Sequence, residues 1–210
     1  MTPIFITGIG TDVGKTIVSA IVTEALQADY WKPIQAGFEN STDALQVSNL
    51  ISNTSTVIHS EVYKLQMPAS PHIAARKENT SIDLQHILHL KPSTLNLQLV
   101  IEGAGGILVP LNETEFVIDL IEQLQAKVIL VSRNYLGSIN HSLLTAHICK
   151  QRNIDVLGWI FNDSYLNYED EIVQWSGYPK IGSIPFATCI NKEFVVQQAQ
   201  EIQLSLRKLL

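Results

Sequence analysis

Short apolar runs alternate along this chain with longer helix-like segments. The apolar runs predict strands, and runs that are apolar throughout are typical of strands covered by helices on both faces. The alternation of strand and helix predicts an α/β fold with a mostly parallel, doubly wound sheet flanked by helices. The predicted strands are Pro3–Thr7, Tyr30–Pro33, Leu97–Ile101, Val128–Ser132, Val156–Asn162 and Ile181–Ile184.

Helices are predicted in the segments between these runs. The stretch from Val57 to Thr94 is the least regular part of the chain, and we interpret it as a lid or an edge element. Because a chain of 210 residues fits one large domain, in which roughly 70% of the unfolded surface is buried, we expect a single domain over residues 1–210. The predicted helices are Lys15–Ala28, Thr42–Ser52, Asp83–Leu90, Phe116–Gln125, Ser138–Gln151, Tyr168–Ser176 and Lys192–Leu209.

A glycine-rich segment, Gly8–Thr16, lies between the first predicted strand and the first predicted helix. It has five residues between its first glycine and Gly14-Lys15-Thr16, one more than the standard phosphate-binding loop. Its position still predicts such a loop and therefore a P-loop fold, in which backbone N–H groups and a helix N-terminus surround phosphates. Lys15 would contact the outer phosphates and the Thr16 hydroxyl would bind Mg²⁺. A lysine in the first turn of a helix is otherwise disfavoured by the helix dipole, which favours an anion beside it.

Polar residues follow the predicted strands at their carboxyl ends, where open α/β sheets bind ligands. They are Lys32, Glu102 and the pair Asn162-Asp163. Together with the phosphate loop they indicate one assembled site. Glu102 opens a glycine-rich turn, and a buried carboxylate there needs a cation or hydrogen-bond donors, so we expect it to bind Mg²⁺ directly or through water.

Each of these residues also has a structural interpretation that the sequence leaves open. Glu102 could be a hydrogen-bonded structural acid, and Lys32 a solvated lysine at a strand end. Asp43 could stabilise a helix N-terminus rather than bind metal. Asn162-Asp163 suits a turn as well as adenine recognition.

Composition and charge narrow the range of functions. Apolar residues make up 46% of the chain and charged residues 16%, which is ordinary for a globular protein with a substantial core. The net charge of −6 argues against nucleic-acid binding, and the chain lacks a run of about 18 apolar residues, so no membrane association is expected. The first strand begins within five residues of Met1, which leaves no room for a signal peptide. Cys149 and Cys189 lack metal-ligand spacing, and we expect them to be reduced thiols in a cytoplasmic protein.

Eight segments in a fixed order resemble dethiobiotin synthetases, the ATP-dependent enzymes of biotin biosynthesis. The phosphate loop is shared with many nucleotide-binding families, whereas the Lys-Pro-Ile, Glu-Gly-Ala-Gly-Gly and Leu-Gly-x-Ile-Asn-His segments are much more specific. The segments are Thr7–Thr16, Trp31–Gly37, Ser41–Asp43, Ser70–Ile73, Glu102–Gly106, Leu136–His141, Gly158–Trp159 with Asn162-Asp163, and Gly182–Pro185.

The resemblance implies an ATP- and Mg²⁺-dependent ligation of 7,8-diaminononanoate with CO₂. One amine adds to CO₂ to give a carbamate, and the carbamate attacks the γ-phosphorus of ATP to form a carbamic–phosphoric anhydride. The second amine then closes the urea ring and releases phosphate. Such a reaction needs charge neutralisation and positioning rather than a covalent enzyme nucleophile.

The resemblance also implies a role for each matching residue, and a homodimer with the substrate site at its interface. The implied catalytic residues are Lys15 and Lys32. The implied metal ligands are Thr16, Asp43 and Glu102. The implied nucleotide contacts are Gly10, Thr11, Asp12, Val13, Gly14, Lys15, Thr16, Ile17, Asn162 and Pro185, and the implied substrate contacts are Lys32, Ala36, Gly137, Ser138 and Asn140.

Three positions depart from the family's usual residues. Ala36 stands where relatives usually carry Ser or Thr, so a hydroxyl on the substrate side is missing unless Gln35 compensates. Asp12 is one methylene shorter than the Glu common there. Ser138 stands where a Cys can occur, and either residue can offer its backbone N–H to the substrate carboxylate.

Three other interpretations compete with this one. An amidotransferase-like ligase of corrinoid synthesis shares the fold but usually carries a second, glutamine-hydrolysing domain, for which 210 residues leave no room. A nucleotide switch of the partitioning-ATPase kind typically has an extra lysine early in the loop, where this chain has Ile9-Gly10-Thr11-Asp12. A nucleotide-binding remnant without activity would not need Lys15, Lys32, Asp43 and Glu102 together.

Overall fold

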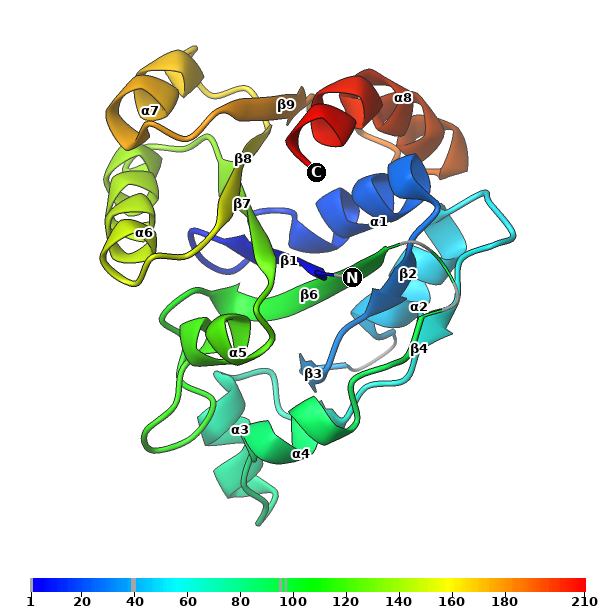
Figure 1. The fold of residues 1–210 in the computed structure, drawn as a ribbon, viewed down its shortest axis with the longest axis vertical. Coiled ribbons are helices and arrows are strands. Elements are labelled where there is room, and N and C mark those ends of the chain that lie inside the picture. The colour runs from blue at the N-terminus through cyan, green and yellow to red at the C-terminus, as the bar shows by residue number, and fades with distance from the viewer. Residues whose placement is uncertain (1, 39–40, 95, 97) are drawn as a thin grey trace.

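The computed structural model describes residues 2–38, 41–94, 96 and 98–210. Its main element is a seven-stranded sheet in the order β4-β2-β6-β1-β7-β8-β9, in which every neighbouring pair is parallel (Figure 1). The predicted α/β fold with a mostly parallel, doubly wound sheet is confirmed. The strands are β1 (Ile4–Gly8), β2 (Asp29–Trp31), β4 (Ile58–His59), β6 (Leu99–Gly106), β7 (Lys127–Arg133), β8 (Val156–Asn162) and β9 (Lys180–Ile184).

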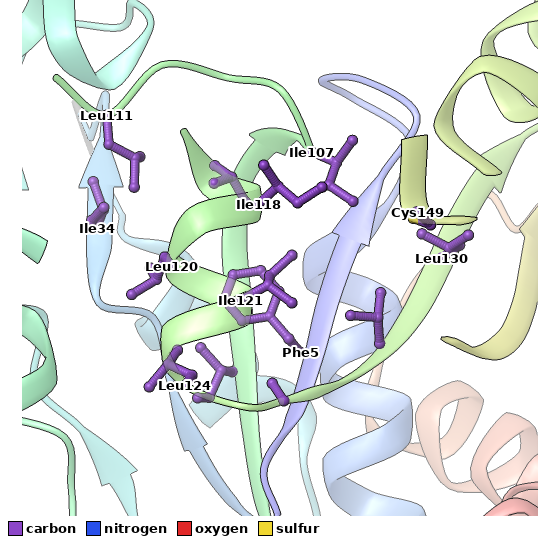
Figure 2. Packing of buried hydrophobic residues seen from close by; sticks show 14 of the residues in the cluster. Phe5, Ile34, Ile107, Leu111, Ile118, Leu120, Ile121, Leu124, Leu130 and Cys149 are labelled. Carbon is purple, nitrogen blue, oxygen red and sulfur yellow. The ribbon is translucent and has the colours of Figure 1, made fainter. Parts of the chain in front are cut away.

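Two apolar layers, one on each face of the sheet, explain why the strands are apolar throughout. Successive side chains of a strand point to opposite faces, so Phe5 packs in one layer and its neighbours Ile4 and Ile6 pack in the other. Figure 2 shows the Phe5 layer from close by, with side chains of α5 among those packed. Helices α1 (Lys15–Leu26), α2 (Asp43–Leu50) and α8 (Lys192–Leu209) contribute to the Ile4 layer, and α3 (Pro71–Lys77), α4 (Leu84–His89), α5 (Val117–Gln123), α6 (Ser138–Gln151) and α7 (Glu169–Ser176) to the Phe5 layer.

Strand β1 lies in the middle of the sheet and fixes where a ligand can bind. β6 and β7 flank it, with β2 and β4 beyond β6 and with β8 and β9 beyond β7 (Figure 1). The chain therefore changes direction across the sheet beside β1, and ligands of open α/β sheets bind at such a point, beyond the carboxyl ends of the strands. The glycine-rich loop follows β1 at this end.

Four short elements differ from the predicted pattern. β3 (Ile34–Ala36) and β5 (Tyr63–Leu65) form a separate two-stranded parallel sheet, while β4 lies at the edge of the main sheet and α3 follows β5. Elements this short carry too few residues to show a hydrophobic period. The position of β4 agrees with the expected edge element between Val57 and Thr94, and a lid stays a prediction.

The predicted boundaries of most longer elements agree with the structure to within a few residues. The end of one strand was predicted wrongly: β6 does not stop at Ile101 before a glycine-rich turn but continues through Glu102 to Gly106, where the glycines allow close approach to β1. α1 begins at Lys15, and Thr42 caps α2 by accepting a hydrogen bond from the Leu45 N–H at 3.2 Å. The predicted start of one strand, Leu97, lies outside the described residues, and β6 is described from Leu99. None of the helices in the described ranges combines the length and the apolar character needed to cross a bilayer.

Candidate active site

The phosphate loop is closed against the end of β8. Asn162, the last residue of β8, donates a hydrogen bond from Nδ2 to the Val13 carbonyl at 3.1 Å. Gly14 has a φ of +89°, and a Cβ added there would lie 1.8 Å from Asn162 Nδ2. Both the backbone conformation and the close approach therefore require glycine at this position. Strand β8 thus sets the shape of a loop that belongs to β1 and α1.

Lys15 is buried at the start of α1, and its side chain turns back over the loop. Its Nζ donates a hydrogen bond to the Gly10 carbonyl at 2.8 Å. Burial lowers the pKa of Lys15 to about 8, against the opposing attraction of Glu102. An anion beside Nζ would stabilise the charged form of Lys15.

Glu102 is a fully hydrogen-bonded carboxylate in the interior of the protein. It is 1% exposed. Its Oε1 accepts hydrogen bonds from Thr16 Oγ1 at 3.0 Å and from Lys32 Nζ at 2.9 Å, and its Oε2 accepts one from the Tyr30 hydroxyl at 2.7 Å. Burial alone would raise the pKa of Glu102, but Lys32 and these hydrogen bonds outweigh it and lower the pKa below its usual value. The carboxylate is therefore ionised.

Lys32 lies between two carboxylates. It forms ion pairs with Glu102 and with Asp43, the first residue of α2. Burial would lower the pKa of Lys32, but the two carboxylates outweigh it and raise the pKa. Gln35 fixes the backbone at Asp43, because its Oε1 accepts the Asp43 N–H at 3.1 Å while its Nε2 donates to the Gly37 carbonyl at 2.9 Å. The ammonium group of Lys32 is therefore both charged and held in place.

These groups share one cavity of about 840 Å³ at the carboxyl ends of β1 and β6. The structure brings ten of the predicted site residues to its wall: Thr11, Asp12, Gly14, Lys15, Thr16, Ile17, Lys32, Ala36, Asp43 and Glu102. The remaining wall was not predicted as part of the site, although five of its residues lie in segments that carry the family resemblance. It consists of Gln35, Gln46, Pro68, Ala69, Ser70, Pro71, Ala104, Gly105 and Val109. The Pro68–Pro71 part lies after β5 and ends on the first residue of α3, and neither element was predicted.

The other predicted nucleotide contacts do not line this cavity. Gly10 accepts the hydrogen bond of Lys15, and Val13 is buried and bonded to Asn162. Pro185 is exposed just after β9. A neighbouring hollow of about 570 Å³ contains Asp163, which pairs with Arg133 at 3.1 Å.

The predicted contacts for the substrate carboxylate lie apart from the cavity, at the N-terminus of α6. Gly137 precedes this helix with a φ of +104°. Ser138 is buried, its hydroxyl lies 2.7 Å from the Tyr168 hydroxyl, and its N–H donates to the Tyr135 carbonyl at 3.0 Å. The Ser138 N–H is therefore already paired within this chain. Asn140 borders a different hollow, of about 330 Å³, between α6 and α7.

The oxygen donors around the cavity suit Mg²⁺. They are the Thr16 hydroxyl and the carboxylates of Asp43 and Glu102, and Mg²⁺ prefers such hard oxygen ligands. Within the described ranges no group of three or more His, Cys, Asp and Glu side chains could hold a metal ion. Mg²⁺ in nucleotide sites is typically bound by one or two carboxylates together with water and phosphate oxygens.

Comparison with known proteins identifies the family. A family model described as an AAA domain matches residues 2–193. The chain is 50% identical over 200 residues to the ATP-dependent dethiobiotin synthetase BioD of Cytophaga hutchinsonii, covering 94% of this chain and 95% of the relative. The chain belongs to the ATP-dependent dethiobiotin synthetase family. A second synthetase of that name, from Christiangramia forsetii, is 45% identical over 95% of both chains. The family is one of ATP-dependent ligases that form C–N bonds, as the sequence motifs predicted.

Solved structures of lower identity show which fold the synthetase family member shares with other ATP-binding proteins. The MinD cell division protein of Aquifex aeolicus has a TM-score of 0.61 at 18% identity, covering 100% of this chain and 97% of that chain. A putative plasmid partition protein of Borrelia burgdorferi bound to AMPPNP has a TM-score of 0.58 at 15% identity, covering 100% of both chains. At such identities the likeness establishes the P-loop fold and carries no statement about activity. The partitioning-ATPase interpretation therefore gains nothing beyond the fold.

Proposed function

We propose that this protein converts 7,8-diaminononanoate and CO₂ to dethiobiotin with ATP and Mg²⁺, releasing ADP and phosphate. One amine forms a carbamate with CO₂ and loses a proton. A carbamate oxygen then attacks the γ-phosphorus as ADP leaves, and the second amine displaces phosphate from the carbonyl carbon to close the ring. Two facts support the proposal: the chain belongs to the synthetase family, and Lys15, Thr16, Lys32, Asp43 and Glu102 meet in one cavity.

Lys15 is proposed to stabilise the transferring phosphoryl group. Its Nζ contacts the Gly10 carbonyl, so a small rotation of the side chain exchanges a neutral acceptor for a phosphate oxygen. A preorganised cation in a partly water-excluded site stabilises negative charge in the transition state without reorganising solvent. The Lys15 ammonium is destabilised by burial, and a phosphate removes that penalty.

Thr16, Asp43 and Glu102 are proposed to hold Mg²⁺ or to orient its bound water. Mg²⁺ bound there would neutralise phosphate charge. Thr16 Oγ1 and Glu102 Oε1 are 3.0 Å apart, so both lie at one corner of the cavity. Asp43 approaches from α2 on the other side of Lys32.

Lys32 is proposed to bind the carbamate as it attacks phosphorus. The Lys32 ammonium group is held between two carboxylates and has little freedom to move. Such a fixed cation lowers the electrostatic cost of bringing the carbamate and the γ-phosphate together. Ala36 lines the cavity without a polar side chain. Gln35 does not replace the missing hydroxyl in this state, because both ends of its amide bond to the Gly37 carbonyl and the Asp43 N–H.

Recognition of the adenine is assigned to Asn162, with Pro185 as a further contact. The Nδ2 of Asn162 is used by the Val13 carbonyl, and its amide oxygen can accept a hydrogen bond from the adenine amino group.

A homodimer is proposed to complete the substrate site. Gly137, Ser138 and Asn140 do not line the 840 Å³ cavity of their own chain, so they could bind the substrate's tail only from a second copy. Large apolar side chains are exposed on and beside α6 and α7: Leu136 is 85%, Leu144 60% and Trp175 53% exposed. Sedimentation that showed only a 23.3 kDa species at micromolar concentration would contradict a shared site.

One experiment tests the reaction itself. The purified protein is incubated with diaminononanoate, bicarbonate, Mg²⁺ and ATP, and the products are analysed by mass spectrometry. We expect dethiobiotin and ADP in equal amounts, and neither ring closure nor ADP when bicarbonate is removed. ATP hydrolysis without dethiobiotin would refute the proposed function.

A further inference from the structure

Tyr30 and Lys32 approach Glu102 from the same side of the sheet. Side chains two residues apart on an extended strand point to the same face, and Trp31 between them packs in the opposite layer. β2 pairs in parallel with β6, with Tyr30 opposite Val100 and Trp31 opposite Ile101. This register places both side chains beside Glu102, the Tyr30 hydroxyl on one carboxylate oxygen and Lys32 Nζ on the other.

The two oxygens of Glu102 have different partners. Oε1 accepts from Thr16 and Lys32 at the cavity, whereas Oε2 accepts from the Tyr30 hydroxyl at 2.7 Å. Tyr30 is completely buried, and it is not among the residues that line the 840 Å³ cavity. The Tyr30 hydroxyl therefore reaches the carboxylate from the interior of the protein and not from the cavity.

We propose that Tyr30 is a positioning residue for the Mg²⁺–nucleotide complex, because its hydroxyl fixes Glu102 with Oε1 turned to Thr16 and the phosphate end of the cavity. The inference rests on the metal role of Glu102 in the proposed function. Without the Tyr30 hydroxyl, Oε2 of Glu102 would have no hydrogen-bond donor. The carboxylate would then rotate toward other donors, and this rotation would turn Oε1 away from Thr16 and the cavity. Partners of this kind orient ligands of bound metals, and removing one typically weakens metal affinity by about 10–100-fold.

The test is Tyr30→Phe, which removes one oxygen atom and keeps the buried ring. Affinity for a fluorescent ADP analogue is measured with EDTA and across a Mg²⁺ titration. We expect the half-saturating Mg²⁺ concentration to rise by about tenfold, while the affinity in EDTA stays within twofold of wild type. The matched control is Tyr63→Phe, since the Tyr63 hydroxyl accepts a hydrogen bond from the Asp83 N–H at 3.0 Å, away from the site. This control should leave both values unchanged.

A double-mutant cycle separates positioning from a general effect on packing. If Tyr30 acts through Glu102, then Tyr30→Phe should change the Mg²⁺ titration of Glu102→Gln by less than twofold. Additive effects in the double variant would overturn the proposal, as would a normal Mg²⁺ titration of Tyr30→Phe. Loss of the folded state in Tyr30→Phe, seen by circular dichroism, would also overturn it, because the hydroxyl would then serve the fold. None of these measurements depends on formation of dethiobiotin, so a failure of the proposed reaction is detected separately.

Discussion

Two buried carboxylates on neighbouring strands are satisfied in different ways. Glu102 lies in the middle of β6, three residues beyond Leu99, and Asp29 begins β2 opposite Leu99 at the amino end of both strands. Glu102 is bound by the Lys32 ammonium and two hydroxyls. Asp29 is bound by neutral donors from its own chain: the Val57 N–H at 2.9 Å, the Thr94 hydroxyl and the Asn96 amide.

The difference shows which charges the fold itself needs. At Asp29, burial would raise the pKa, but the hydrogen bonds from Thr94, Val57 and Asn96, with a smaller contribution from His59, outweigh it and lower the pKa. At Glu102 the chain also buries two lysines, whose desolvation is costly. Since Asp29 is satisfied without a lysine, we infer that the two lysines at the cavity serve an anionic ligand rather than the fold. The predictions below test this contrast.

The largest effect is expected for Lys15→Gln. If Lys15 stabilises the transferring phosphoryl group as proposed, its removal should lower kcat by at least roughly 10²–10³-fold. The free energy of unfolding without nucleotide should not fall, because burial already disfavours the Lys15 charge. Steady-state kinetics and urea unfolding check both statements, with Lys127→Gln as the control on β7. Normal turnover of Lys15→Gln would remove the loop from the mechanism.

The next largest effect is expected for Glu102→Gln. We expect a loss of about 10–100-fold in kcat/KM for ATP, together with loss of the rise in melting temperature that MgATP gives the wild type. Asp29→Asn should keep that rise in full. If MgATP raised the melting temperature of Glu102→Gln as much as that of the wild type, Glu102 would have a structural role, as Asp29 does.

Asp29→Asn should affect stability rather than catalysis. Replacing an ionised acceptor of three donors should lower the free energy of unfolding by about 1–3 kcal/mol. Turnover by the folded enzyme should stay within twofold, because Asp29 lies at the opposite end of β2 from Lys32. Chemical denaturation and kinetics at saturating substrate measure the two quantities, and a large loss of kcat would break the contrast.

The stability that Asp29 provides should also depend on pH in a defined direction. Because the pKa of Asp29 is lowered in the folded state, the unfolded state binds more protons in acid, and the contribution is complete above the unfolded pKa of about 3.9. It is lost as the pH falls through the folded pKa. The difference in unfolding free energy between wild type and Asp29→Asn should therefore shrink below about pH 4 and stay constant from pH 5 to 7. A difference that grew in acid would refute this assignment.

The smallest effect is expected for His59→Ala. His59 Nε2 lies 3.6 Å from Asp29, which is longer than a hydrogen bond. If the neutral donors provide most of the stabilisation of the Asp29 carboxylate, removing His59 should change the free energy of unfolding by less than about 1 kcal/mol at pH 7. A loss as large as that of Asp29→Asn would mean that Asp29 also depends on a cation.

The same contrast explains what the sequence could predict. Lys32 and Glu102 could be predicted as site residues because each follows an apolar run. A charged side chain at the end of a buried strand is costly unless it serves a ligand or an ion pair. Tyr30 could not be predicted in this way, because an aromatic residue inside an apolar run indicates only packing, and its hydroxyl contact depends on the register of β2 with β6. Asp29 was missed because its donors come from two segments that show no periodic pattern.

The wall of the cavity shows a similar limit. Ala36 was predicted at the site from its motif, and it lines the cavity. Gln35 was considered only as a substitute for a hydroxyl, whereas it connects β3 to the start of α2. The Pro68–Pro71 segment lines the cavity because it follows β5, which pairs with β3. Both strands have only three residues, so their sequences show too little pattern for the strands to be predicted.

The central place of β1 has a consequence for synthesis of the chain on the ribosome. The hydrogen-bonding partners of β1 are β6 and β7, which begin at Leu99 and Lys127. At roughly 5–20 residues per second, the ribosome needs at least several seconds after making β1 before either partner exists. During that time the apolar segment that forms β1 has no strand to pair with. Pairing between strands far apart in the sequence is also slow. This protein should therefore depend on chaperones during translation more than proteins whose first strand pairs with the second.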